Sequence, residues 1–230
     1  MLNKKRILIT IGVIVSILIF ASGQLFAAGK KKIILIDPAH GGKDQGVKLN
    51  NDVFEKDITL TVALLIKKAL ARENNVELYL TRESDEEVDL EDRRDIIKKI
   101  KPDFFLSLHV NGGFGKEASG FELYYPEFSE DAVKGKKAKK ENVTQLRNKC
   151  QGDSLKMAKI IQENMNALFP RKGRGLRKAD MPITDGLLVP AVSVEMGFAT
   201  NPEDKKKLLA VKTQTEIAKA LANSIKLFYR

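Results

Sequence analysis

The sequence contains few of the side chains that form disulfides, bind metals or act as nucleophiles. Its 230 residues include one cysteine, Cys150, and two histidines, His40 and His109. A single cysteine excludes an intrachain disulfide, and no histidine lies near Cys150 in the sequence to activate its thiol. Chemistry that depends on imidazole groups must therefore use His40, His109 or both.

The charge of the chain is unbalanced towards lysine and arginine. The 40 basic and 30 acidic residues give a formal net charge of +10, and hydrophobic residues make up 43% of the chain. This composition is typical of a soluble globular protein, and the length fits one domain. The positive charge favours anionic partners such as nucleic acid, acidic lipid or an acidic cell envelope. We expect no nucleic-acid partner, because no basic stripe is interleaved with aromatic residues.

Residues 1–29 have the pattern of an export segment. Basic residues at positions 4–6 precede an uncharged apolar run at 7–20, and small residues follow. That order predicts a signal peptide. The uncharged stretch is also close to the ~20 residues that cross a bilayer, so a retained signal anchor is the alternative. We expect an exported protein of the periplasm or cell envelope, which contacts the inner membrane only if that anchor is not cleaved.

Apolar runs of strand length alternate with amphipathic helical stretches along residues 31–230. The runs are short and are followed by glycine, proline or polar residues, as expected for buried strands. The alternation predicts a single α/β domain with a twisted, largely parallel central sheet of about six strands flanked by helices. Strands are expected at 31–37, 76–81, 103–109, 120–125 and 191–195. Helices are expected at 54–69, 89–100 and 157–168, after an Asn201 cap, and after a capping box of Thr213 and Glu216.

The segment at about 126–152 interrupts this pattern. It is rich in lysine and poor in apolar residues, so we expect an inserted surface segment. One interpretation is a solvated loop or loose helix. The other is a part that covers the active site or grips an anionic substrate.

The two histidines occupy equivalent places in the predicted sheet. His40 follows the strand at 31–37, and His109 ends the strand at 103–109. Because the carboxyl ends of parallel strands line one crevice, the two imidazoles can meet there. Neutral imidazoles suit zinc, and a carboxylate commonly completes a two-histidine set that leaves one position open. The pattern therefore predicts a zinc site with a third, acidic ligand.

Glu55 and Glu195 are the acidic candidates for this site. Glu55 lies at the start of the helix after the His40 loop, but with Asp52 as the N-cap it would equally suit the N3 position of a capping box. Glu195 ends an apolar strand, where an ionised carboxylate is costly unless paired. It is either the partner of a basic residue or a general base beside a metal site. The pattern alone leaves both choices open.

Five stretches of the chain resemble, in order, the motifs of a known family. They are Ile36–Gly46, Glu55–Asp57, Leu80–Asp85, Ser107–Asn111 and Pro190–Phe198. Together they resemble the zinc-dependent N-acetylmuramoyl-L-alanine amidases of bacterial cell-wall turnover. Ala39 replaces a glycine that is usual in the first motif, and Gly112 replaces an alanine that is common after the fourth. Neither departure affects a ligand position.

The resemblance implies zinc-dependent hydrolysis of the amide between N-acetylmuramic acid and L-alanine in peptidoglycan. It implies one zinc ion per chain, held by His40, Glu55 and His109, with Glu195 as the catalytic residue. Asp37 and Asn111 lie close to ligands in the sequence and are candidates to support them.

Two other functions could use the same residues: a zinc peptidase that cuts within the stem peptide, and a non-catalytic cell-wall-binding regulator. Peptidoglycan is the expected partner in each case, and a protein activator is a further candidate. In some related enzymes, a helix inserted between the last two motifs blocks the zinc. The segment at 126–152 lies in that interval.

Overall fold

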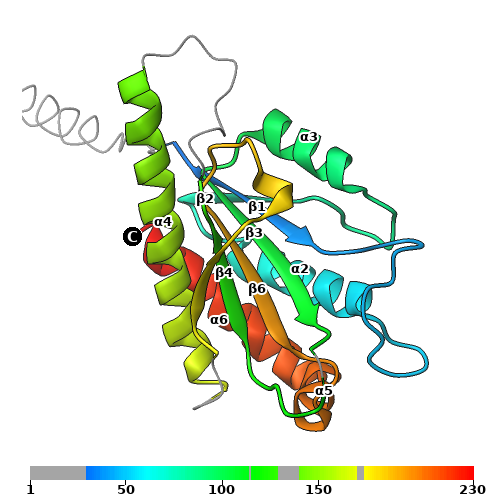
Figure 1. Ribbon diagram of the computed structural model, residues 1–230. Helices are drawn as coiled ribbons and strands as arrows, with labels where there is room; N and C mark the ends of the chain where they lie inside the picture. The colour runs from blue at the N-terminus through cyan, green and yellow to red at the C-terminus, as the bar shows by residue number, and fades with distance from the viewer. Residues whose placement is uncertain (1–29, 114, 129–139, 170–173) are drawn as a thin grey trace, which may run out of the picture. The chain divides into compact units, whose positions relative to one another are not determined.

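A six-stranded sheet forms the centre of the unit that runs from Lys32 to Arg230 (Figure 1). The sheet has the order β2-β1-β3-β6-β4-β5, and every pairing is parallel except that of β4 with β6. The carboxyl ends of β1, β3 and β6 therefore share one edge with the start of β4. The strands are β1 (Lys32–Pro38), β2 (Val76–Leu80), β3 (Phe104–Asn111), β4 (Glu122–Pro126), β5 (Leu176–Ala179) and β6 (Ala191–Phe198).

The computed structural model describes residues 30–113, 115–128, 140–169 and 174–230. The predicted signal peptide or signal anchor, residues 1–29, lies outside the described residues. Among the helices of the described part, none combines the length and apolar character needed to cross a membrane.

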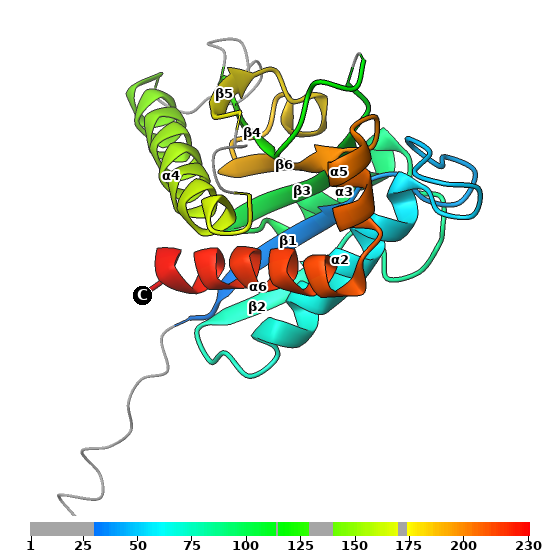
Figure 2. The same ribbon diagram turned by 90° about the horizontal axis from the view of Figure 1, so that it is seen from below.

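The helices cover the two faces of the sheet unequally (Figures 1 and 2). The helices α2, α4 and α6 pack on one face, with α6 against both α2 and α4, whereas α3 and the short 3₁₀ turn η2 lie over part of the other face. The helix α5 follows β6 directly. The bounds are α2 (Glu55–Leu70), α3 (Leu90–Ile100), α4 (Lys140–Asn166), η2 (Pro182–Thr184), α5 (Pro202–Leu208) and α6 (Val211–Phe228).

Side chains alternate between the two faces along each strand, and this alternation fixes the register. Ile34, Leu106 and Val194 belong to the large core under α2, α4 and α6, and each is fully or almost fully buried. Their neighbours Leu35 and Phe105 belong to a smaller cluster on the opposite face. A slip by one residue would exchange the faces and expose the large core, and each exposed Leu or Ile side chain would cost ~1.5–3 kcal/mol. Beyond the small cluster, the second face carries polar side chains.

The α/β fold and the largely parallel sheet predicted from the sequence are confirmed. The five expected strands are present with ends shifted by at most three residues. The sixth strand, β5, was not predicted, because its four residues, Leu-Arg-Lys-Ala, form no apolar run. It forms by pairing in parallel with β4 over Leu123–Pro126.

Two of the predicted helix N-caps are wrong, and the helix expected at 157–168 begins earlier, at Lys140. The helix α2 begins at Glu55 with Phe54 as its N-cap, and the Phe54 amide donates to Asp57 Oδ2 at 2.8 Å. Asp57, not Glu55, therefore fills the N3 position, and Asp52 lies outside the helix. The helix α6 begins at Val211, upstream of the expected Thr213–Glu216 box. The predicted Asn201 cap of α5 is confirmed.

The lysine-rich segment expected at 126–152 ends within a helix. Residues 129–139 lie outside the described residues, and residues 140–152 form the first half of α4. This half is continuous with the helix predicted around Met157, and Cys150 is buried within it. Burial raises the pKa of the Cys150 thiol to about 11, which leaves it protonated and unreactive.

The Asn201 cap gives a stability prediction for the fold. Asn201 Oδ1 accepts from the amides of Glu203 and Asp204, and Asn201 Nδ2 donates to the Lys116 carbonyl at 2.7 Å. We expect Asn201→Ala to lower the free energy of unfolding by about 1–2 kcal/mol in urea titrations. Asn148→Ala, at an exposed position in α4, serves as the control and should change it by less than about 0.5 kcal/mol. Equal effects of the two substitutions would contradict the capping role.

Candidate active site

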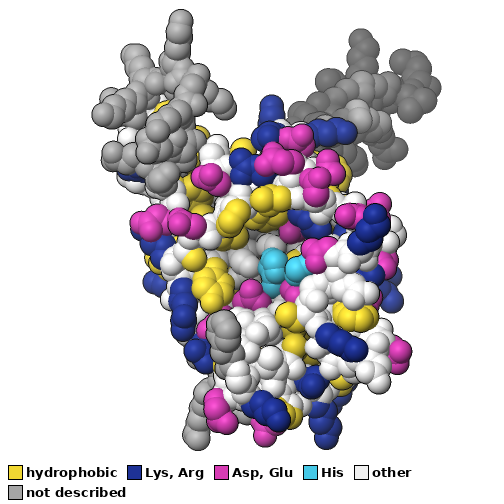
Figure 3. Space-filling view, turned by 45° about the vertical axis from the view of Figure 1, so that its right-hand side comes forward, with side chains coloured by type: hydrophobic (Ala, Val, Ile, Leu, Met, Phe, Trp, Pro, Cys, Tyr) yellow, Lys and Arg dark blue, Asp and Glu magenta, His cyan; other side chains and the backbone are white. Residues whose placement is uncertain are grey.

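A row of polar side chains crosses the open face of the sheet at the carboxyl ends of β1, β3 and β6. They occupy the alternate positions that point away from the large core: Asp37 on β1, Ser107 and His109 on β3, and Glu195 on β6. His109 is paired in register with Glu195. The row lies in a hollow, and Figure 3 shows the two histidines at its centre with hydrophobic side chains beside them.

The loop after β1 places His40 beside this row. His40 has a left-handed backbone with a φ of 62°, an uncommon conformation for a residue other than glycine. Two buried arginines hold the loop, because Arg82 donates to the carbonyls of Pro38 and Ala39, and Arg93 donates to the carbonyl of His40. Arg93 also forms a buried ion pair with Asp37. These hydrogen bonds from Arg82 and Arg93 hold His40 in its strained backbone conformation.

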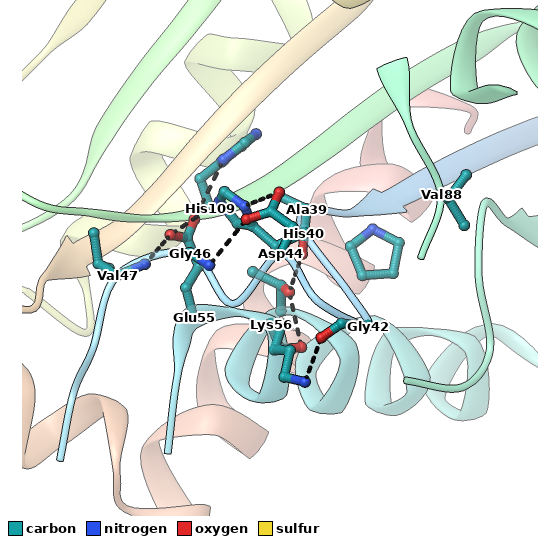
Figure 4. A network of polar contacts seen from close by, with 12 residues as sticks. Ala39, His40, Gly42, Asp44, Gly46, Val47, Glu55, Lys56, Val88 and His109 are labelled. Carbon is teal, nitrogen blue, oxygen red and sulfur yellow. Dashed lines mark hydrogen bonds and ion pairs between the residues drawn. The ribbon is translucent and has the colours of Figure 1, made fainter. Parts of the chain in front are cut away.

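His40, Glu55 and His109 meet at one point, as predicted from the sequence. Their ligand atoms all lie within 4.8 Å of one another. His40 Nε2 lies 3.1 Å from Glu55 Oε2, and His109 Nδ1 lies 3.3 Å from Glu55 Oε1 (Figure 4). The two rings are nearly perpendicular, with an interplanar angle of 86° and centroids 5.9 Å apart.

The outer nitrogen of each imidazole is fixed by a second contact. His40 Nδ1 lies 2.8 Å from Asp44 Oδ2, and His109 Nε2 lies 3.0 Å from Ser107 Oγ. Ser107 donates its own proton to Asp37 Oδ2 at 3.1 Å, so it accepts the proton of His109 Nε2. These contacts leave His40 Nε2 and His109 Nδ1 facing Glu55, and each of these nitrogens can bind a metal once it has lost its proton.

Of the two predicted supporting residues, Asp37 reaches a histidine and Asn111 does not. Asp37 contacts His109 through Ser107, whereas Asn111 Nδ2 donates to Glu122 Oε2 at 3.0 Å. Sequence reasoning missed the contacts of Asp44 and Ser107. Ser107 lies two residues before His109 on a strand, a spacing that places both side chains on one face and could have indicated it.

Glu55 is held as a buried carboxylate. Its Oε2 accepts from the Val47 amide at 3.1 Å, and its Oε1 accepts from the Val110 amide at 2.9 Å. Burial opposes the charge, but the hydrogen bonds to His109 and His40 outweigh it and lower the pKa of Glu55 to about 2. The same pairing with Glu55 raises the pKa of His40 to about 9. Glu55 is therefore ionised and paired with the two imidazoles, and a metal ion that takes their place around it must displace their protons.

Glu195 lies beside this cluster in a different environment. Its Oε2 atom is buried and has no hydrogen-bond partner among the described residues. Burial raises the pKa of Glu195 to about 7, helped by the charges of Glu55 and Glu122 and opposed by that of His109. A carboxylate with a pKa near neutrality can both accept and donate a proton, as a general acid–base group must. No basic side chain pairs with it among the described residues, so the alternative of a structural ion pair is not supported.

The three clustered side chains fit a zinc ion. Two imidazole nitrogens and one carboxylate form a donor set found in catalytic zinc sites, where they leave a fourth position open. The contacts to Asp44 and Ser107 are of the kind that orient metal-bound histidines. The structure thus brings together all four residues that the sequence assigned to metal binding and proton transfer.

Comparison with known proteins agrees with this arrangement. The sequence profile of the N-acetylmuramoyl-L-alanine amidase family matches residues 34–227, which include the whole site. The chain belongs to this family. It is 29% identical to the N-acetylmuramoyl-L-alanine amidase AmiA of Salmonella typhimurium over 220 residues, which cover 86% of this chain and 76% of AmiA.

Two solved amidase structures share the fold. An N-acetylmuramoyl-L-alanine amidase from Clostridium difficile 630 superposes with a TM-score of 0.72 at 23% identity, over 87% of this chain and 97% of the other. The CwlD amidase of Clostridioides difficile, solved in complex with the GerS lipoprotein, gives a TM-score of 0.70 at 25% identity, over 86% and 98% of the two chains. The chain is therefore an amidase, and the α/β unit described above has the architecture of amidase catalytic domains.

Two cavities of this amidase meet at its candidate metal site. The larger, of about 520 Å³, is lined by His40, His109 and residues 87–90. The smaller, of about 280 Å³, lies over β4 and is lined by His109, Tyr124 and Asp180. Ser107, His109, Pro182 and Ile183 line both cavities. An extended substrate could therefore lie on both sides of the metal site at once.

Gly46 is a further residue on which the candidate metal site depends. Its φ is 64°, and a Cβ atom there would lie 2.6 Å from both Glu55 Oε2 and His40 Cδ2. We expect Gly46→Ala to displace these ligands and weaken zinc binding about 10- to 100-fold, as loss of a supporting contact does. Competition with a chelating dye measures the affinity. Gly186→Ala is the control, because Gly186 has a φ of 69° but open space around it, and its zinc affinity should not change.

Proposed function

We propose that this amidase uses zinc to hydrolyse the amide between N-acetylmuramic acid and L-alanine in peptidoglycan, for cell-wall turnover or cell separation. The observation that carries the proposal is the convergence of His40, Glu55 and His109 within 4.8 Å, next to the strand position of Glu195. His40 lies in a loop and Glu55 at a helix start, whereas His109 and Glu195 lie on strands. Only the folded edge of the sheet brings these four side chains together.

Each residue has a separate role in the proposed reaction. His40 Nε2, Glu55 and His109 Nδ1 hold the ion, while Asp44 and the Ser107–Asp37 pair keep the two rings in place. Zinc, when bound, polarises an amide carbonyl and acidifies water. Glu195 accepts a proton from the attacking water at Oε2, its unpartnered oxygen, and donates it to the nitrogen of the departing L-alanine.

The experiment that tests the function is mass spectrometry of purified peptidoglycan after digestion. We expect intact stem peptides with a free L-alanine amine, and glycan whose lactyl carboxylates are free. Cleavage within the stem peptide would instead identify a peptidase. Unchanged peptidoglycan in the presence of zinc would favour a non-catalytic wall-binding regulator.

The proposed setting is the cell envelope. An export segment at residues 1–29 would deliver the chain to the periplasm or envelope, either as a cleaved signal peptide or as an inner-membrane anchor. Because CwlD was solved with the GerS lipoprotein, we include a protein activator among the proposed partners.

A further inference from the structure

The two cavities that meet at His109 differ in the charged groups in and around them. Three exposed acidic side chains, Asp44, Glu87 and Asp89, line the larger cavity. The basic residue in that lining is Arg93, which is buried and already paired with Asp37. The larger cavity also contains the apolar side chains of Val88, Leu90, Pro182 and Ile183. It therefore suits an uncharged ligand with methyl groups and disfavours an anion.

No lysine or arginine lines the smaller cavity, but Arg177 on β5 stands beside one of its walls. Tyr124, in its wall, is paired in register with Arg177 on β5, and Arg177 is half exposed. Arg177 lies on the face of the sheet that carries the active site, because its Nη2 comes within 3.5 Å of Glu122 Oε1 and Glu122 pairs with Glu195 across the strands. The arginine therefore stands two strands away from the proposed proton carrier.

Arg177 is not saturated by its carboxylate partner. Glu122 Oε1 also accepts from Arg174 Nε at 2.8 Å, a shorter contact than the one with Arg177. The other oxygen, Glu122 Oε2, accepts from Asn111 and from the Tyr124 hydroxyl. Two guanidinium groups thus share one carboxylate. Asp180 also lines this cavity and partly offsets their charge.

The substrate of the proposed reaction has a matching asymmetry. On one side of the scissile amide is an N-acetylated sugar, which is uncharged and carries methyl groups. On the other side, the stem peptide continues from L-alanine to a D-glutamyl residue with a free α-carboxylate. A guanidinium group forms charge-assisted, often paired, hydrogen bonds to such a carboxylate.

We propose that Arg177 binds the α-carboxylate of the second stem-peptide residue, so that the peptide crosses β4 and β5 while the sugar occupies the larger cavity. This inference rests on the proposed function, because it takes the scissile amide to lie at the His40–Glu55–His109 site. It makes Arg177 a residue that selects stem peptides with a free carboxylate over those in which this group is amidated.

The test is binding of two product peptides to the zinc-loaded enzyme, measured by calorimetry at low ionic strength. L-alanyl-D-glutamate and L-alanyl-D-isoglutamine differ only in the α-carboxylate, which is an amide in the second peptide. We expect the unmodified enzyme to bind the carboxylate form about 10-fold more tightly, as for one hydrogen-bonded charge pair. Arg177→Gln should remove this preference and Arg177→Lys should keep part of it.

Lys178→Gln is the matched control. Lys178 is the next residue on β5 and is similarly exposed, but it pairs with Glu127 at 2.5 Å. Its replacement should leave the 10-fold preference intact. Equal affinities for the two peptides in the unmodified enzyme, or a preference that survives Arg177→Gln, would overturn the inference. Since the readout is binding, this result is separate from whether peptidoglycan is hydrolysed.

Discussion

Glu195→Gln is expected to lower the turnover number on peptidoglycan about 10²- to 10⁴-fold, the usual contribution of a general acid–base group. Glutamine has nearly the shape of the buried glutamate but cannot accept a proton from the attacking water. Glu195 is not among the three clustered ligands, so the zinc content should stay at that of the unmodified enzyme. Release of muramoyl-free stem peptides gives the rate, and metal analysis of the same sample gives the zinc content.

Glu83→Gln is the matched control for this prediction. Glu83 is exposed and pairs with Lys67 on the surface at 2.5 Å, so the same chemical change there should leave the rate within a factor of about two. If Glu195→Gln kept most of the activity, Glu195 would not carry the proton. If it lost the zinc together with the activity, Glu195 would have to be counted among the ligands.

His109→Ala is expected to abolish both zinc binding and hydrolysis. The substitution removes one of three protein ligands, whereas loss of a residue that only supports a ligand typically costs about 10- to 100-fold in metal affinity. We therefore expect the affinity of His109→Ala for zinc to fall by more than about 100-fold. Ser107→Ala removes only the contact to His109 Nε2, so its affinity for zinc should fall about 10- to 100-fold.

Metal removal provides the readout for this series. Chelation should inactivate the unmodified enzyme, and added zinc should restore its activity fully. The activity of Ser107→Ala should also return, but at higher zinc concentrations. Zinc should not restore His109→Ala. Tyr79→Ala, at an exposed position on β2, should behave like the unmodified enzyme throughout. Activity that persists after complete removal of the metal would contradict the proposed chemistry.

The sequence was sufficient to predict most of the sheet and the meeting of His40 and His109 at one of its edges. Apolar runs ending at His40 and His109 mark buried strands, and parallel strands bring such ends together. Arg93 lies on the apolar side of its helix, where a buried guanidinium group requires a carboxylate partner, and that partner is Asp37. The choice of Glu55 as the third ligand depended on family resemblance, since a glutamate near a helix start has an ordinary structural use as well.

The sequence was not sufficient where tertiary contacts decide the structure. The strand β5 has no strand-like pattern of its own and exists through pairing with β4. The start of α2 moved to Glu55 because Asp57, rather than Asp52, satisfies the first free amide. The contact of Asp44 with His40 depends on the turn made by the intervening glycines, whose positive φ angles allow it. These features follow from the folded loop and sheet, not from residue spacing.

The most direct test of the account is a crystal structure of the zinc-loaded enzyme with anomalous data at the zinc absorption edge. We predict one strong peak in each chain at about 2.1 Å from His40 Nε2, His109 Nδ1 and a Glu55 oxygen, with Glu195 nearby but not bound to it. A peak that lacks any one of these three ligands, or its appearance elsewhere in the chain, would contradict the central claim.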